Sequence, residues 1–356
     1  MLSAILVAIF AALSAPNPQQ EPARAPQLVS AGSMVGMTFG AGSGIYFRVS
    51  HDSGRNFDAP VKVADADVLP LNRHRGPRIA LSGATIVITA VTGYRLSQDP
   101  HGHGLPSDGD LTAWRSVDGG KSWSGGVVVN DVPGAAREGL HSLAGGPNGR
   151  LFAVWLDKRG ATGTRLFSAR SNDSGVTWSK NVLVYASPDG TICECCHPSA
   201  VIDPNGQIFV MWRNWLGGAR DMYLARSRDG ETFTNIEKLG EGSWQLNACP
   251  MDGGGLAIYQ DRVVTAWRRD QTVYLAEPGG REKALGEGRE IALAAGANGS
   301  YAAWVDSSGV EIRTPDASRP VLLSGSGTLP ALASLSDGAV LAAWEENGVI
   351  KTKRVE

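Results

Sequence analysis

The sequence has no excess of charge of one sign, no helical periodicity and no long hydrophobic run. Its 356 residues include 33 Lys and Arg and 35 Asp and Glu, which gives a formal net charge of -2. The basic residues are scattered and form no stripe, which argues against a nucleic-acid-binding surface. Because 42% of the residues are hydrophobic and 19% charged, the chain is neither disordered nor a coiled coil.

The apolar run at residues 2–13 is too short to span a bilayer. No Lys or Arg precedes it, but the small residues around Ser14 and Ala15 suit a cleavage site. We therefore expect a signal peptide over residues 1–15 and a flexible leader over residues 16–26. The protein is then secreted or periplasmic, with no transmembrane anchor after processing.

A turn motif occurs four times and divides the chain into similar units. The copy from Ser116 to Trp123 reads SVDGGKSW, and its relatives begin at Ser50, Ser171 and Ser227. In each copy the aspartate can accept hydrogen bonds from the N–H groups of the turn, and a glycine permits positive φ. These structural aspartates are Asp52, Asp118, Asp173 and Asp229.

This motif resembles the Asp-box (BNR repeat) of the sialidase-like β-propeller family. The resemblance implies an all-β protein built from four-stranded antiparallel blades, with the boxes as fold markers that carry no chemistry. The chain then forms one propeller domain over residues 27–356. A Cys-Glu-Cys-Cys loop at Cys193 further resembles bacterial exported members of the family.

Seven segments look like second strands of blades, most of them ending in tryptophan. They lie at residues 35–39, 86–90, 151–155, 208–212, 263–267, 300–304 and 340–344. Sialidases suggest six blades, whereas this count favours seven. The last unit stops after its third strand, and a short N-terminal strand is one way to complete it.

Arginine, histidine, cysteine and acidic residues gather in the links that enter the inner strands and in the links between second and third strands. In an up-and-down propeller both sets lie on one face, opposite the boxes, so we expect them to form a mouth over the central channel. Six arginines there would bind an anionic ligand, because guanidinium groups match carboxylates, although each taken alone is more often a surface residue or a loop-bracing donor. They are Arg75, Arg78, Arg137, Arg159, Arg213 and Arg268.

The resemblance to sialidases also implies a carboxylate clamp, a loop aspartate as acid/base, and a tyrosine nucleophile backed by a glutamate. Arg78, Arg213 and Arg268 are the expected clamp, Asp99 or Asp108 the acid, and Glu138 the helper. The nucleophile is the weak part of the match. The late tyrosines Tyr259, Tyr274 and Tyr301 lie on predicted strands, and Tyr94 lies in a mouth loop of the wrong blade.

Only four cysteines are present: Cys193, Cys195, Cys196 and Cys249. In an exported protein the favoured interpretation is a disulfide from Cys249 to Cys195 or Cys196, joining neighbouring blades, with Cys193 paired to the remaining cysteine. The alternative is a copper or zinc site held by thiolates and His197, with His74 or His141 from a neighbouring link as a further ligand. Two further histidines, His101 and His103, are interpreted as solvated.

We therefore expect a monomeric, sialidase-like glycoside hydrolase or glycan-binding protein that recognises an anionic sugar without a cofactor. The alternatives are a non-catalytic partner-binding propeller with structural disulfides, and a periplasmic Cys/His metal-binding protein.

Overall fold

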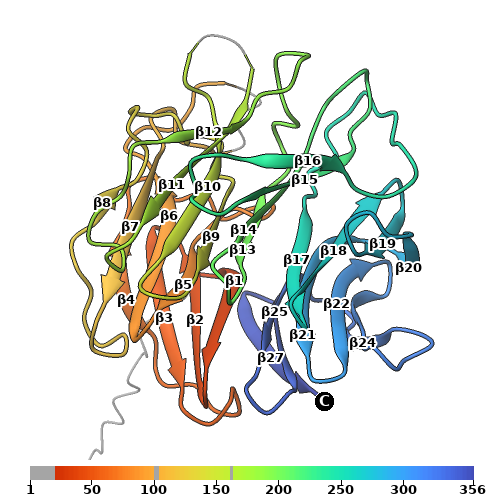
Figure 1. The fold of residues 1–356 in the computed structure, drawn as a ribbon. Coiled ribbons are helices and arrows are strands. Elements are labelled where there is room, and N and C mark those ends of the chain that lie inside the picture. Colours follow the sequence, from red (N-terminus) through yellow and green to blue (C-terminus); the bar gives the residue numbers. More distant parts are fainter. Residues whose placement is uncertain (1–20, 100–103, 161–162) are drawn as a thin grey trace, which may run out of the picture.

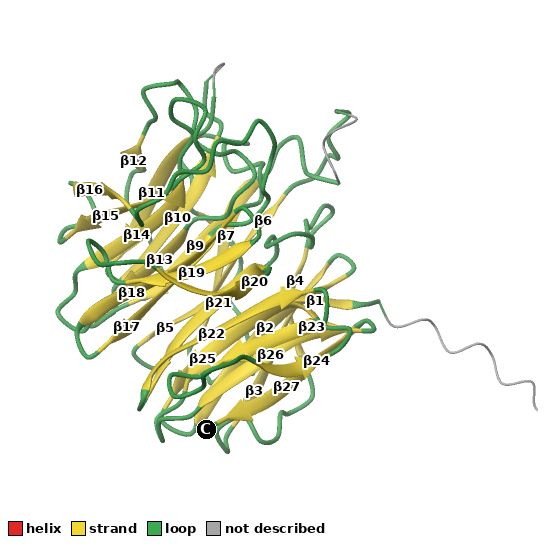
Figure 2. Ribbon diagram, turned by 90° about the vertical axis from the view of Figure 1, so that its right-hand side faces the viewer, coloured by secondary structure: helices red, strands yellow, loops and turns green. Residues whose placement is uncertain are grey.

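A computed structural model describes residues 21–99, 104–160 and 163–356 as seven antiparallel sheets around a central axis, without a helix. Figure 1 shows the sheets following one another around the ring, and Figure 2 shows the same all-strand architecture from the side. The predicted all-β propeller with seven blades is confirmed. No helix of the described residues is suited by length and hydrophobicity to cross a membrane.

The first four blades each have four strands in sequence order. Blade one contains β1 (Ala23–Ala31), β2 (Met34–Ala41), β3 (Gly44–Ser50) and β4 (Val61–Asp65). Blade two contains β5 (Arg78–Ser82), β6 (Thr85–Thr92), β7 (Asp110–Ser116) and β8 (Val127–Val128). Blade three contains β9 (His141–Gly145), β10 (Leu151–Asp157), β11 (Arg165–Ser171) and β12 (Val182–Tyr185). Blade four contains β13 (Ser199–Ile202), β14 (Ile208–Arg213), β15 (Met222–Ser227) and β16 (Thr234–Lys238).

The last three blades are built the same way, except that the seventh has three strands among the described residues. Blade five contains β17 (Gly254–Tyr259), β18 (Arg262–Arg269), β19 (Thr272–Ala276) and β20 (Lys283–Glu287). Blade six contains β21 (Arg289–Gly296), β22 (Gly299–Asp306), β23 (Gly309–Arg313) and β24 (Val321–Ser324). Blade seven contains β25 (Thr328–Ser334), β26 (Val340–Glu346) and β27 (Val349–Val355).

All seven predicted second strands are second strands of blades. They are mostly apolar because neighbouring blades cover both of their faces; every residue of β10, for example, is buried. Trp155, Trp212 and Trp304 are among the largest fully buried side chains. The hydrophobic core is therefore a ring of contacts between adjacent sheets.

The ring closes where the first and last blades meet, seen in Figure 1 as red strands beside blue ones. The suggested N-terminal strand of blade seven is wrong, because β1 pairs with β2 inside blade one. Several hydrogen bonds join the two blades instead; among them, Ala25 N donates to Glu345 Oε1 at 2.6 Å, and Ala23 N donates to Gly348 O at 2.9 Å. Strand β1 thus begins four residues before the predicted start of the domain at residue 27.

The four boxes form the predicted turns between third and fourth strands. In the second box, Ser116 Oγ donates to Asp118 Oδ1 and accepts from Gly120 N, both at 2.8 Å. Gly120 has a φ of +90°, and a Cβ there would lie 2.1 Å from the Phe47 ring. Hydrogen bonds from Asn56, then Ser50, lower the pKa of Asp52 to about 2. Each box is therefore a self-contained turn whose carboxylate is satisfied locally.

Candidate functional site

A cavity of about 430 Å³, which we call the mouth cavity, opens on the face opposite the boxes. It is formed by links of both predicted sets, from blades one to five, so those links do converge on one rim of the ring. The long insert between β6 and β7, residues 93–109, contributes Asp99. Its charged and sulfur-bearing lining residues are Arg75, Asp99, Arg137, Glu138, Lys158, Glu194, Cys195, Cys249 and Met251.

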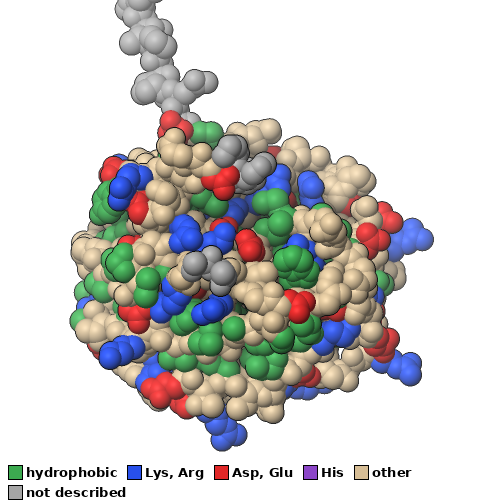
Figure 3. Space-filling view, turned by 90° about the horizontal axis from the view of Figure 1, so that it is seen from above, with side chains coloured by type: hydrophobic (Ala, Val, Ile, Leu, Met, Phe, Trp, Pro, Cys, Tyr) green, Lys and Arg blue, Asp and Glu red, His purple; other side chains and the backbone are tan. Residues whose placement is uncertain are grey.

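Charges of both signs alternate around the mouth cavity. Lys158 Nζ lies 2.7 Å from Glu138 Oε1 and 3.4 Å from Glu194 Oε2, and Arg75 Nη2 lies 3.7 Å from Glu138 Oε2. Burial opposes the charged form of Lys158, but Glu138 and Glu194 outweigh it and raise its pKa. Figure 3 shows the molecule from above with basic and acidic side chains intermixed on this face. The cavity is therefore polar and nearly balanced in charge.

Two of the six predicted arginines, Arg75 and Arg137, line the mouth cavity. Arg75 is buried, and its Nε donates to Glu138 O at 2.6 Å. Arg137 Nη1 donates to the carbonyls of Gly134 and Lys158, at 3.2 and 3.3 Å. No described residue accepts a hydrogen bond from its Nε or Nη2, which leaves that edge of the guanidinium for a ligand.

The other four arginines brace the protein. Buried Arg78 donates to the carbonyls of His141, Pro77 and His74, and Arg213 to those of Asp252, Arg220 and Arg268. Arg268 Nε lies 3.1 Å from Asp252 Oδ2. The predicted clamp of Arg78, Arg213 and Arg268 therefore does not line the mouth cavity, although Arg78 lines the channel beneath it.

Arg159 is held by a carboxylate of its own blade. Its Nε and Nη2 donate to the two oxygens of buried Asp157, each at 2.9 Å, and its guanidinium lies 3.9 Å from the centre of the Phe167 ring. Asp157 also accepts from Trp155 Nε1 at 2.8 Å. Arg159 thus fastens the β10–β11 link and is not among the described residues that line the mouth cavity.

The predicted catalytic residues are only partly brought together. Asp99 and Glu138 line the mouth cavity, whereas Tyr94 is 82% exposed and does not. Asp108 accepts from the backbone N–H groups of Tyr94 and Arg95 and so braces the insert. All seven tyrosines are described, and none of them lines the mouth cavity. His101 and His103 lie outside the described residues, as does the predicted signal peptide.

Three cysteine sulfurs form a cluster beside the mouth cavity. Cys193 Sγ lies 3.8 Å from Cys195 Sγ and 3.3 Å from Cys196 Sγ, and the last two are 4.0 Å apart. Hydrogen bonds from the other two thiols, with the charges of Arg213 and Arg220, hold the pKa of Cys193 well below its usual range. All four cysteines are free thiols, so the predicted disulfide from Cys249 is not formed in this structure.

A second buried polar cluster lies beneath the mouth, and the sequence offers two of its members, His74 and His197, only as possible metal ligands beside the cysteines. The rings of His74 and His197 stack with centroids 4.3 Å apart, and His74 Nε2 lies 3.9 Å from Asp252 Oδ1. Burial lowers the pKa of His74 to about 3 and raises that of Asp252 to about 6. His197 follows Cys196 and His74 precedes Arg75 in the sequence. No sequence pattern indicates, however, that these histidines contact Asp252.

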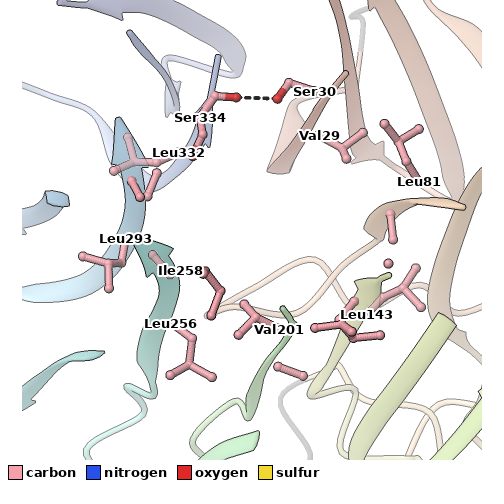
Figure 4. Close-up of a pocket in the computed structure, with 18 of the residues that line it drawn as sticks. Val29, Ser30, Leu81, Leu143, Val201, Leu256, Ile258, Leu293, Leu332 and Ser334 are labelled. Carbon is pink, nitrogen blue, oxygen red and sulfur yellow. Dashed lines mark hydrogen bonds between the residues drawn. The ribbon is translucent and has the colours of Figure 1, made fainter. Parts of the chain in front are cut away.

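Most of the side chains that line the lower part of the central channel are aliphatic. This part has a volume of about 460 Å³ and is lined by the seven inner strands. Figure 4 shows Val29, Leu81, Leu143, Leu256 and Leu293 arranged around the open space. The channel is therefore lined mainly by aliphatic side chains in its lower part and by polar residues such as His74, Arg78 and His197 in its upper part.

The fold, the boxes and the polar mouth define a sialidase-like β-propeller. The BNR repeat-like domain model matches residues 44–261, and the chain belongs to that family. No curated protein matches the chain.

Several solved sialidase structures share the fold. The intramolecular trans-sialidase of the leech is 13% identical with a TM-score of 0.59, over 95% of this chain and 68% of that one. That of Ruminococcus gnavus is 11% identical with a TM-score of 0.55, over 94% of each chain. The NanB sialidase of Streptococcus pneumoniae is 12% identical with a TM-score of 0.53, over 96% and 70%. At these identities the likeness is one of fold alone.

Proposed function

We propose that the protein is an exported, monomeric propeller that binds a small anionic sugar in its mouth cavity. The observation that carries this proposal is the position of Arg137, whose free guanidinium edge lines a cavity of about 430 Å³. Pockets for small molecules occupy about 300–1,000 Å³. The cavity suits a single sugar residue.

The neighbouring side chains complete the recognition. The Nε and Nη2 groups of Arg137 can donate side by side to one ligand carboxylate, the geometry in which arginine binds carboxylates best. Glu138 and Glu194 can accept hydrogen bonds from sugar hydroxyls, while Lys158 holds both carboxylates in place. The negative charge of the ligand would balance the Arg137 guanidinium, of which only Nη1 donates to described residues.

Binding is favoured over the covalent sialidase mechanism, because no tyrosine lines the mouth cavity. Hydrolysis by another route is the second candidate. It is supported by Asp99 and Glu138, two carboxylates that line the same cavity as Arg137. In that reaction Asp99 would protonate the leaving oxygen and Glu138 would assist a nucleophile.

Two assays on the purified protein separate these candidates. Ligand-observed NMR should detect binding of N-acetylneuraminate or glucuronate and none of neutral N-acetylglucosamine. A fluorogenic sialoside should give no turnover by folded protein. Equal binding of neutral and anionic sugars would refute anion recognition, and turnover abolished by Glu138→Gln would establish hydrolysis instead.

A further inference from the structure

The sulfur cluster has the dimensions of a three-coordinate metal site. Its three Sγ···Sγ separations, 3.3, 3.8 and 4.0 Å, are all far longer than the ~2.05 Å of a disulfide bond. The point equidistant from the three sulfurs lies about 2.2 Å from each, close to the ~2.3 Å of a metal–thiolate bond. An ion fits among these thiolates without movement of the loop.

The surroundings of the cluster suit an anionic metal–thiolate centre. Cys193 and Cys196 are buried, and Arg220 Nη1 donates to Cys193 Sγ at 3.1 Å. Arg220 is itself fixed, because its Nε donates to Leu246 O at 3.1 Å and its guanidinium lies over the Trp215 ring. Such outer partners orient metal ligands and compensate their charge.

The cluster is connected to solvent through the mouth cavity. Cys195 belongs to the cluster and also lines the mouth cavity, as does Cys249. Cys249 is exposed, and Met251 lines the same wall. An ion arriving from solvent therefore meets a thiol and a thioether before it reaches the buried cysteines.

We propose that Cys193, Cys195 and Cys196 bind one Cu(I) ion in trigonal coordination, with Cys249 and Met251 as the sulfur ligands of its approach. Soft thiolate and thioether ligands select Cu(I), whereas structural zinc sites are four-coordinate. On binding, the ion displaces the remaining thiol protons to solvent, and no electron is transferred. This site stands on the sulfur geometry and is independent of sugar binding.

The test is an anaerobic titration of the reduced full-length protein with Cu(I), in competition with the chelator bicinchoninate. We expect one Cu(I) per chain, and loss of this binding in Cys195→Ser, whose partly exposed position tolerates the change. Cys249→Ser should keep the stoichiometry, and Arg220→Gln should weaken binding by about 10–100-fold. Circular dichroism establishes that each variant is folded.

Two outcomes of this titration would overturn the proposal. One is wild-type protein that fails to compete for Cu(I), and the other is folded Cys195→Ser that competes as well as wild type. X-ray absorption of the copper-loaded protein should show three sulfur neighbours, and nitrogen or oxygen ligands in their place would refute the site. Counting thiols in the exported protein, after chelation and denaturation, should find all four free; disulfides would refute it.

Discussion

His141 Nε2 lies 3.0 Å from Thr89 Oγ1, with the imidazole ring fully buried between blades two and three. Burial, reinforced by the charge of Arg78, lowers the pKa of His141 to about 3. The folded protein therefore keeps this ring neutral at pH values where the unfolded chain protonates it. Stability from this group is present above about pH 6.5 and is lost as the pH falls toward 3.

We predict that His141→Gln makes the protein less sensitive to acid. Between pH 6 and 4 the free energy of unfolding of the variant should fall less steeply than that of wild type, by about 1.4 kcal/mol per pH unit. Urea denaturation at several pH values measures the slope. The exposed His51→Gln is the control and should keep the wild-type slope; an unchanged slope in His141→Gln would contradict the neutral, buried assignment.

The Arg159–Asp157 pair should be structural and should not affect ligand binding. Lysine at position 159 lacks the planar fork through which Arg159 donates in parallel to the two oxygens of Asp157. We expect Arg159→Lys to lower the free energy of unfolding by about 1–3 kcal/mol, because a buried carboxylate loses charge-assisted hydrogen bonds. Urea denaturation checks the loss, and sugar affinity should stay as in wild type; weakened affinity with intact stability would place Arg159 in the site.

The box serine should stabilise its turn measurably. Ser171 Oγ donates to Asp173 Oδ1 at 2.7 Å and accepts from Gly175 N at 2.9 Å. Ser171→Ala leaves the buried Gly175 N–H without its acceptor, at a cost of about 1–3 kcal/mol. Thermal unfolding compared with Ser308→Ala, in an exposed turn, gives the difference. Equal unfolding of the two variants would show that the box turn does not depend on its serine.

Ring closure should depend on Glu345. Its Oε1 accepts from Ala25 N at 2.6 Å, which ties β1 to the three-stranded seventh blade. Glu345→Ala should lower the free energy of unfolding by about 1–3 kcal/mol. Hydrogen exchange of the Ala25 amide should rise as well, whereas the exposed Glu287→Ala leaves it unchanged. Unaltered exchange in Glu345→Ala would mean that ring closure does not depend on Glu345.

The blades were predictable from the sequence, and the roles of individual charged residues were not. Period-two alternation and recurring residues such as Trp155 are local signals, so all seven second strands were found. The partners of Arg78 and Arg213 are backbone carbonyls, several of them supplied by other blades, and no residue type in the sequence marks them. No local pattern marks Lys158 either, because its two carboxylate partners come from separate loops.

The most direct test of the account is calorimetric titration of N-acetylneuraminate into wild type and Arg137→Met. A charge-assisted hydrogen bond contributes about 1.5–3 kcal/mol, so Arg137→Met should bind more than about tenfold more weakly. Arg281→Met, on an exposed loop outside the mouth cavity, should bind as wild type does. Equal affinity of Arg137→Met and wild type, or no binding by wild type, would contradict a mouth cavity that recognises anionic sugars through Arg137.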